Sequence, residues 1–109
     1  MIIKLNKNDS KVVHSNETYD VIDNDTLNNL IVSKTILHSK QKTSGHNHKG
    51  QEEVYIFIGG SGFMQLDDEK FIVKAGDIVL IEDGVYHRVF NESNFDLQFI
   101  CVFNGGRNH

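Results

Sequence analysis

The chain has a single cysteine among its 109 residues, which excludes a disulfide bond within it. Cys101 lies in the apolar run from Phe99 to Phe103, where we expect a small buried hydrophobic side chain. No apolar stretch approaches the roughly 20 residues needed to cross a bilayer. The start of the chain is too short and too polar for a signal peptide. These absences predict a cytoplasmic protein without a membrane partner.

Basic charge is also scarce. Eleven basic residues stand against fifteen acidic ones, which gives a formal net charge of -4 at pH 7, and no basic stripe is present. Phosphate neutralisation dominates the binding of nucleic acids, so this balance argues against a nucleic-acid partner. The length suffices for one modest hydrophobic core. We therefore expect a single domain over residues 1–109, with its core in residues 30–103.

No long segment has apolar residues at the 3.6-residue spacing of a helix. Apolar residues tend instead to recur at every second position, as in a strand. Residues 30–37 are rich in β-branched side chains and predict a strand, as do residues 54–58. Further strands are expected at 63–66, 71–73, 78–81, 88–90 and 95–103, with a hairpin joining the first two of these. Short strands at intervals of about 8–12 residues are typical of an all-β sandwich or barrel.

Two regions depart from this pattern. In residues 1–29, loops surround the short apolar piece Val12-Val13, where we expect an edge strand. Asp25 and Thr26 could equally cap a single helical turn. The glycine cluster at residues 59–62 predicts a turn or a bulge, because glycine adopts backbone angles that other residues resist.

Four residues in this framework have metal-binding chemistry: His46, His48, Glu53 and His87. If His46 and His48 lie on a strand, they share one of its faces. Three imidazoles and a carboxylate are a suitable ligand set for manganese, iron, nickel, cobalt or zinc. Imidazoles gathered beside a carboxylate in an apolar cavity would be poorly solvated without an ion. We therefore predict a site for a divalent transition metal at the ends of several antiparallel strands. The other histidines, His14, His38 and His109, are expected to be structural or exposed.

These residues resemble the two sequence motifs of the cupins. In the first motif, His46-Asn47-His48 is followed by four residues and Glu53, and then by six residues and Gly60. The second motif is represented by Gly76, Gly84, His87 and Asn91.

The chain departs from the cupin motifs at two positions. Lys40 stands where the first motif usually begins with glycine, although Gly45 directly precedes His46. Glu82 stands where the second motif usually has proline. The resemblance covers residues 30–103 and implies a small cupin β-barrel, a jelly-roll-like double-stranded β-helix. It also implies that the metal ligands are His46, His48, Glu53 and His87.

The strand that begins at Glu53 has two contrasting faces. Glu53, Tyr55 and Phe57 share one face, so a Glu53 that points to the metal places the other two side chains in the same cavity. The opposite face is wholly apolar, with Val54, Ile56 and Ile58. A chain of this size has few elements to cover that face, and we expect a homodimer.

Among cupins, the segment from Gly45 to Tyr55 is most similar to the sugar-phosphate isomerase branch. That similarity implies an aldose–ketose interconversion of a sugar or sugar phosphate through an enediol, with two sugar oxygens chelating the metal. Tyr55 and Tyr86 are the catalytic candidates, and Phe57, Gln65 and Arg88 are the candidate substrate contacts.

Two other functions fit the same set of residues. An iron ion held by them could activate dioxygen on a small organic substrate, a reaction that consumes oxygen, whereas isomerisation does not. Alternatively, a non-enzymatic binding or sensing module could use the metal, or the empty barrel, to hold a small molecule or carbohydrate. Binding without conversion would identify such a module.

Overall fold

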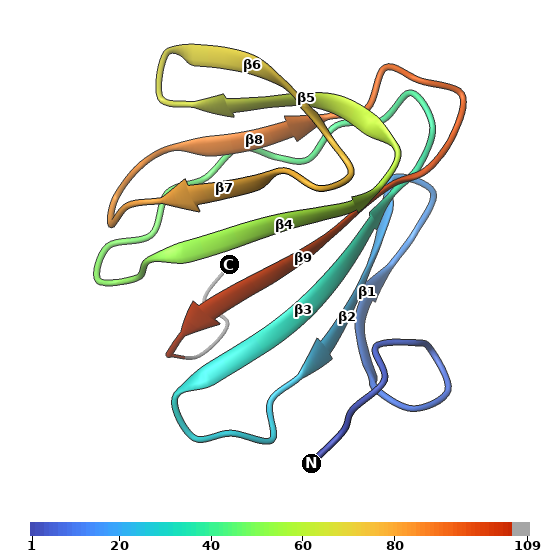
Figure 1. Ribbon diagram of the computed structural model, residues 1–109, viewed down its shortest axis with the longest axis vertical. Coiled ribbons are helices and arrows are strands. Elements are labelled where there is room, and N and C mark those ends of the chain that lie inside the picture. Colours follow the sequence, from blue (N-terminus) through green and yellow to red (C-terminus); the bar gives the residue numbers. More distant parts are fainter. Residues whose placement is uncertain (106–109) are drawn as a thin grey trace.

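The computed structural model describes residues 1–105, which form antiparallel strands in two sheets (Figure 1). The larger sheet has the strand order β1-β2-β3-β9-β4-β7, and the smaller has the order β6-β5-β8. The strands are β1 (Lys11–Ser15), β2 (Tyr19–Asn24), β3 (Leu30–Leu37), β4 (Glu53–Gly59), β5 (Ser61–Leu66), β6 (Glu69–Lys74), β7 (Ile78–Ile81), β8 (His87–Phe90) and β9 (Leu97–Asn104). Within residues 1–105 there is no helix long and apolar enough to span a membrane. His109 lies outside the described residues.

The all-β architecture predicted from the two-residue period is confirmed, and β3 and β7 begin and end where the pattern places them. The β5–β6 hairpin is longer than predicted. Its ladder runs from Ser61 opposite Lys74 to Leu66 opposite Glu69, which leaves a two-residue turn at Asp67 and Asp68. Asp67 takes a φ of 50°, the left-handed conformation that tight hairpin turns require.

The hydrophobic core lies between the two sheets. Alternate residues of β9 point inward, and Leu97, Phe99, Cys101 and Phe103 are all buried. The ring of Phe99 packs against Phe57, with ring centroids 5.2 Å apart. Burial of each such ring contributes about 2–3 kcal/mol to folding. Cys101 is a free, buried thiol, in line with its apolar neighbourhood in the sequence.

The chain passes from the larger sheet to the smaller one at Gly60. This residue has a φ of +84°, and a β-carbon there would lie 2.5 Å from the carbonyl oxygen of Asp96. Only glycine meets both conditions. The ladder between β4 and β9 is shifted just before this point, between Phe57 and Gly59, so the predicted turn or bulge is present.

Asn91 joins the end of β8 to the end of β3 and is almost completely buried. Its side-chain amide donates hydrogen bonds to the carbonyl oxygens of Leu37 at 3.0 Å, His38 at 3.2 Å and Phe95 at 2.7 Å. Its side-chain oxygen accepts from the backbone and hydroxyl of Ser93. Asn91 therefore holds the loop between β8 and β9 against the barrel wall.

The N-terminal region forms a hairpin, β1–β2, that extends the larger sheet beyond β3. Its outer strand, β1, lies at the edge of the sheet and contains the apolar pair Val12-Val13. The sequence pattern did not predict β2. Asp25 and Thr26 lie in the loop that follows β2, and the alternative of a helical turn at these residues is wrong.

Candidate metal centre and cavity

Three histidines from two distant segments converge at one end of the barrel. His46 and His48 lie in the irregular connection between β3 and β4, not on a strand as the sequence suggested, while His87 opens β8. Backbone hydrogen bonds join the two segments: His46 N donates to His87 O at 3.2 Å, and His87 N donates to His46 O at 3.0 Å. One ligand atom from each imidazole lies within 4.8 Å of the others.

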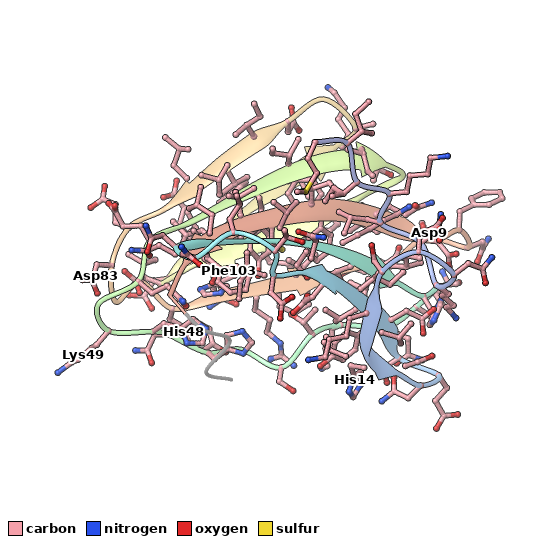
Figure 2. The ribbon with its side chains drawn as sticks, turned by 90° about the horizontal axis from the view of Figure 1, so that it is seen from below. Asp9, His14, His48, Lys49, Asp83 and Phe103 are labelled. Carbon is pink, nitrogen blue, oxygen red and sulfur yellow. The ribbon has the colours of Figure 1, made fainter. Side chains whose placement is uncertain are left out.

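The segment between β3 and β4 is also held, at His48 and Gly50, by contacts with the loop between β7 and β8. Gly84 N donates a hydrogen bond to the carbonyl oxygen of His48 at 3.0 Å, and Gly50 N donates to the Asp83 carboxylate at 2.8 Å. Figure 2 shows His48 close to Lys49 and Asp83 at this end of the molecule. The backbone on both sides of His48 is therefore held in place, which limits the freedom of its imidazole.

Glu53, the first residue of β4, faces the histidines. Its Oε1 lies 3.4 Å from His87 Nε2 and 3.9 Å from His48 Nε2, and all three side chains are buried. Two ligands that each lie about 2.0–2.2 Å from one ion are separated by roughly 3–4 Å. The spacing and the chemistry of His46, His48, Glu53 and His87 thus fit a divalent transition metal. Such an ion supplies Lewis-acid polarisation of an oxygen atom and lowers the pKa of bound water.

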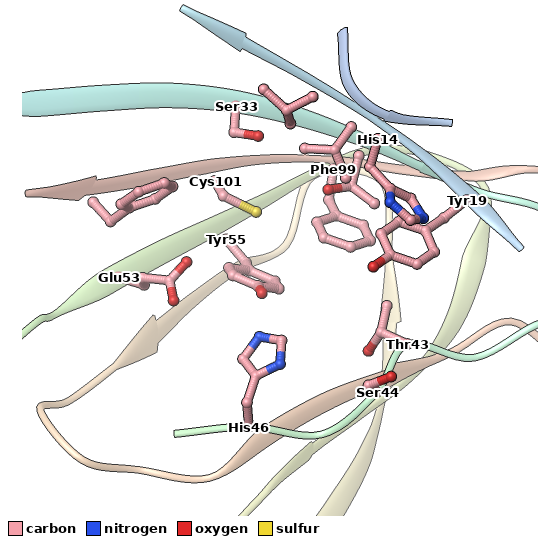
Figure 3. Close-up of a pocket in the computed structure, with 14 residues that line it drawn as sticks. His14, Tyr19, Ser33, Thr43, Ser44, His46, Glu53, Tyr55, Phe99 and Cys101 are labelled. Atoms are coloured by element: carbon pink, nitrogen blue, oxygen red, sulfur yellow. The ribbon is translucent and has the colours of Figure 1, made fainter. Parts of the chain in front are cut away.

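A cavity of about 330 Å³ adjoins this group (Figure 3). His46 and Glu53 form part of its wall, and the close-up shows Tyr55 beside Glu53 and above His46. Most of the remaining wall is apolar or carries hydroxyl groups. No lysine or arginine is among the described residues that line it. The full lining consists of Val13, His14, Tyr19, Val21, Ser33, Thr35, Thr43, Ser44, His46, Glu53, Tyr55, Phe99, Cys101 and Phe103.

Two of the aromatic candidates lie on the inner side of β4. Tyr55 lines the cavity, and its ring stacks on Phe99 with centroids 5.0 Å apart and an interplanar angle of 18°. This stacking fixes the plane of the Tyr55 ring. Phe57 is buried in the core beside Phe99 and is not part of the cavity lining.

The remaining candidates lie outside this lining. The Tyr86 hydroxyl packs against Gly45 and occupies the position that a β-carbon of residue 45 would need. The Gln65 amide donates to the carbonyl oxygen of Asp67 at 2.7 Å. Arg88 Nε donates to the carbonyl oxygen of Thr43 at 2.7 Å. Tyr55 therefore lines the cavity beside the metal group, whereas Tyr86, Gln65 and Arg88 are not among the residues that line it.

The sequence reasoning missed the part of the cavity that the N-terminal hairpin provides. His14 is exposed, as expected, but it also lines the cavity together with Tyr19. On β3, Ser33 and Thr35 are polar residues at inward positions, and their alternation with outward residues was a usable signal. His38 lies instead between two carboxylates, 3.4 Å from Asp20 and 3.3 Å from Asp96.

Similar proteins were found by sequence. An uncharacterized protein from Methanocaldococcus jannaschii is 37% identical over 70 residues, which are 64% of this chain and 56% of that protein. The chain thus spans little more than half the length of that relative. An oxalate-binding protein from Thermotoga maritima is 27% identical over 84 residues, 66% of this chain and 69% of the other.

Solved structures share the fold at low sequence identity. KdgF from Halomonas sp. superimposes with a TM-score of 0.83 at 15% identity, over 99% of this chain and 96% of that one. A predicted oxalate decarboxylase from Thermotoga maritima gives a TM-score of 0.77 at 20% identity, over 95% and 98%. The family model of the cupin domain matches residues 34–103, well over half of the sequence. The chain belongs to the cupin family.

Proposed function

We propose that this cupin binds a divalent transition metal through His46, His48, His87 and Glu53, and uses it to hold a small organic ligand. The observation that carries the proposal is the convergence of the three imidazoles within 4.8 Å, beside a 330 Å³ cavity that His46 and Glu53 line. Manganese, iron, nickel, cobalt and zinc all suit mixed nitrogen and oxygen ligands. A ligand with two adjacent oxygen atoms would chelate such an ion.

The chemistry of the cavity favours a compact carboxylate over a sugar phosphate. A phosphate dianion is usually held by arginine, lysine or a helix N-terminus, and none of these lines the cavity within residues 1–105. A carboxylate that chelates the ion has its charge compensated by the metal itself. The relative from Thermotoga maritima, named an oxalate-binding protein, supports a ligand of this class.

The second candidate is an aldose–ketose isomerase that acts on an unphosphorylated sugar. The hydroxyls of Thr35, Thr43 and Ser44 line the cavity and suit a ligand rich in hydroxyl groups. Tyr55, held by its stacking on Phe99, would then be the group that moves a proton between adjacent carbons. A metal-loaded protein that interconverts an aldose and a ketose would establish this alternative.

We also propose that the protein is a homodimer. On the outer face of the larger sheet, Val54 lies between Leu80 and Val102, and Ile56 lies between Ile78 and Ile100. These six residues are called the outer apolar face below. Because all six side chains, on β4, β7 and β9, are uncharged and apolar, the same face of a second copy is a matching partner. A native mass at micromolar concentration tests this directly.

The function is tested with protein purified without an affinity tag. Elemental analysis is expected to find a transition metal in the parent and to find little in the His48→Ala variant. Calorimetry is then expected to show oxalate binding to the metal-loaded parent and none to protein stripped with a chelator. Metal content unchanged by His48→Ala would overturn the ligand assignment, and equal binding with and without metal would overturn the role of the ion. Oxygen uptake with a small organic substrate would instead indicate a dioxygenase.

A further inference from the structure

A β-bulge in β1 directs His14 toward the cavity. In the β1–β2 ladder, Val12 is opposite Ile22 and His14 is opposite Val21, so Val13 is an extra residue. Consecutive residues of a regular strand point to opposite faces, whereas a bulge places two neighbouring side chains on nearly the same side. Val13 and His14 accordingly both line the cavity.

His14 is an exposed residue of β1, and a stacking contact orients its ring. It stacks on Tyr19, with ring centroids 4.5 Å apart and an interplanar angle of 26°. Tyr19 in turn opens β2, and its backbone N donates to the side-chain oxygen of Asn16 at 3.0 Å. Both rings therefore belong to an ordered hairpin, and both line the cavity.

His14 and Tyr19 lie across the cavity from the carboxylate of the metal group. Figure 3 shows the stacked pair on one side and Glu53 on the other, and Figure 2 places His14 well away from His48. The cavity thus has two polar ends. One end carries the metal ligands, and the other offers an imidazole and a phenol as hydrogen-bonding groups.

We infer that His14 and Tyr19 form a second binding point for a ligand with two polar ends. This inference rests on the proposed function and narrows its ligand class. The ligand is a 2-oxo or 2-hydroxy acid whose first end chelates the metal and whose far end carries a further carboxylate. The far carboxylate carries one charge, less than a phosphate dianion, and accepts hydrogen bonds from the His14 ring and the Tyr19 hydroxyl. Hydrogen bonds to a charged group of this kind change affinity by about 10- to 100-fold.

The test compares ligands that share a chelating end and differ at the other end. The full-length, metal-loaded protein is titrated by calorimetry with lactate against malate, and with pyruvate against 2-oxoglutarate. The parent is expected to prefer the acid with the second carboxylate by about 10- to 100-fold. His14→Ala is expected to abolish most of this preference, and His14→Gln, which keeps a hydrogen-bond donor, to retain part of it.

Three further measurements separate a binding role from a structural one. Tyr19→Phe keeps the stacked ring and is expected to lower only the affinity for the two-ended acids. Glu17→Gln, an exposed change in the same hairpin, is the matched control and is expected to behave as the parent. Metal content and melting temperature of each variant show that it is folded.

The possible outcomes distinguish this inference from the function on which it rests. If His14→Ala keeps the parent's preference, or the parent has none, the second binding point is wrong and the metal-dependent function stands. If the metal-loaded parent binds neither these acids nor oxalate, the proposed function is wrong and the inference falls with it.

Discussion

The Nδ1 atom of His87 lies 3.1 Å from the carbonyl oxygen of Val85. A carbonyl oxygen only accepts hydrogen bonds, so Nδ1 carries the ring proton in this contact. In a neutral ring with this tautomer the lone pair is on Nε2, which lies 3.4 Å from Glu53 Oε1. A metal-binding histidine commonly donates its other ring N–H to a carbonyl in this way, which fixes its tautomer and its orientation.

Replacing His87 by alanine is expected to reduce metal content sharply. The change removes the imidazole that the Val85 carbonyl orients, and leaves only His46, His48 and Glu53 near the site. A metal present at about 100 times its dissociation constant stabilises the folded parent by about 2.7 kcal/mol, so the variant should lose most of the rise in melting temperature that added metal produces. Elemental analysis and thermal melts with and without metal measure both effects. His14→Gln, a change away from the three-histidine cluster, should retain the parent's metal response; a full response in His87→Ala would refute its role as a ligand.

Glu53→Gln tests the carboxylate separately from the imidazoles. The amide has nearly the same shape but lacks the negative charge, so we expect the affinity for a divalent ion to fall by at least about tenfold. Competition with a chelator of known affinity measures the change. Glu52→Gln, on the exposed neighbouring residue, is the matched control. Equal affinities for Glu53→Gln and the parent would show that the carboxylate does not bind the ion.

The motif spacing predicted which four side chains would lie close together. The structure brings them together differently from the prediction that His46 and His48 share one face of a strand. His46 and His48 do not lie on a strand; backbone hydrogen bonds to His87 and Gly84 hold their segment against the barrel. Those contacts join residues about 40 apart in the chain, and local periodicity carries no information on them. The two-residue period was informative wherever a strand is regular, as in β3 and β7.

The same period could have corrected one of the substrate predictions. His87 is buried at the start of β8, so its strand neighbour Arg88 points to the opposite face, where its Nε donates to the carbonyl oxygen of Thr43. The bulge at Val13 is the opposite case. It breaks the alternation in β1, and no local signal in the sequence predicted that His14 would face the cavity.

Asn91→Ala is expected to destabilise the protein by about 2–4 kcal/mol, because it leaves buried carbonyl oxygens of Leu37, His38 and Phe95 without their donor. Asn91→Asp keeps the acceptor for Ser93 but places a carboxylate against those carbonyls, and should be at least as harmful. Urea unfolding measures the free energy of each variant. Asn94→Ala, an exposed change in the same loop, should stay within about 0.5 kcal/mol of the parent. A comparable result for Asn91→Ala would show that the loop does not depend on this amide.

Asp20 makes the stability depend on pH. Burial alone would raise the pKa of its carboxyl. The hydrogen bonds from Ser15 and Lys7 and the charges of Lys7 and His38 lower it by more, so the net pKa is below the ordinary value of 3.8. A carboxyl whose pKa is lowered on folding stabilises the protein above its unfolded pKa, and this contribution is lost as the pH falls through the folded value.

Asp20→Asn is therefore expected to cost about 1 kcal/mol at pH 7, with the difference from the parent shrinking as the pH falls below about 4. Urea unfolding of both proteins across this range, in the presence of a chelator, gives the difference at each pH. Asp25→Asn, at an exposed carboxylate of the loop after β2, is the matched control for the loss of one negative charge. A constant difference for Asp20→Asn would contradict the role of its charge.

A charged substitution on the outer apolar face is expected to separate the two protomers of the proposed dimer. Leu80 is 69% exposed on β7 and lies opposite Val54, so Leu80→Glu would place a charge within an apolar contact. In a twofold dimer each copy contributes the same residue, so one substitution introduces two charges. We expect the dissociation constant of the dimer to rise by roughly two orders of magnitude.

Ile72 is 70% exposed on β6, in the smaller sheet, and Ile72→Glu is the matched control for added surface charge. Native mass spectrometry at micromolar concentration should find dimers of the parent and of Ile72→Glu, and monomers of Leu80→Glu. Dimers that persist in Leu80→Glu would place the contact between copies on another surface.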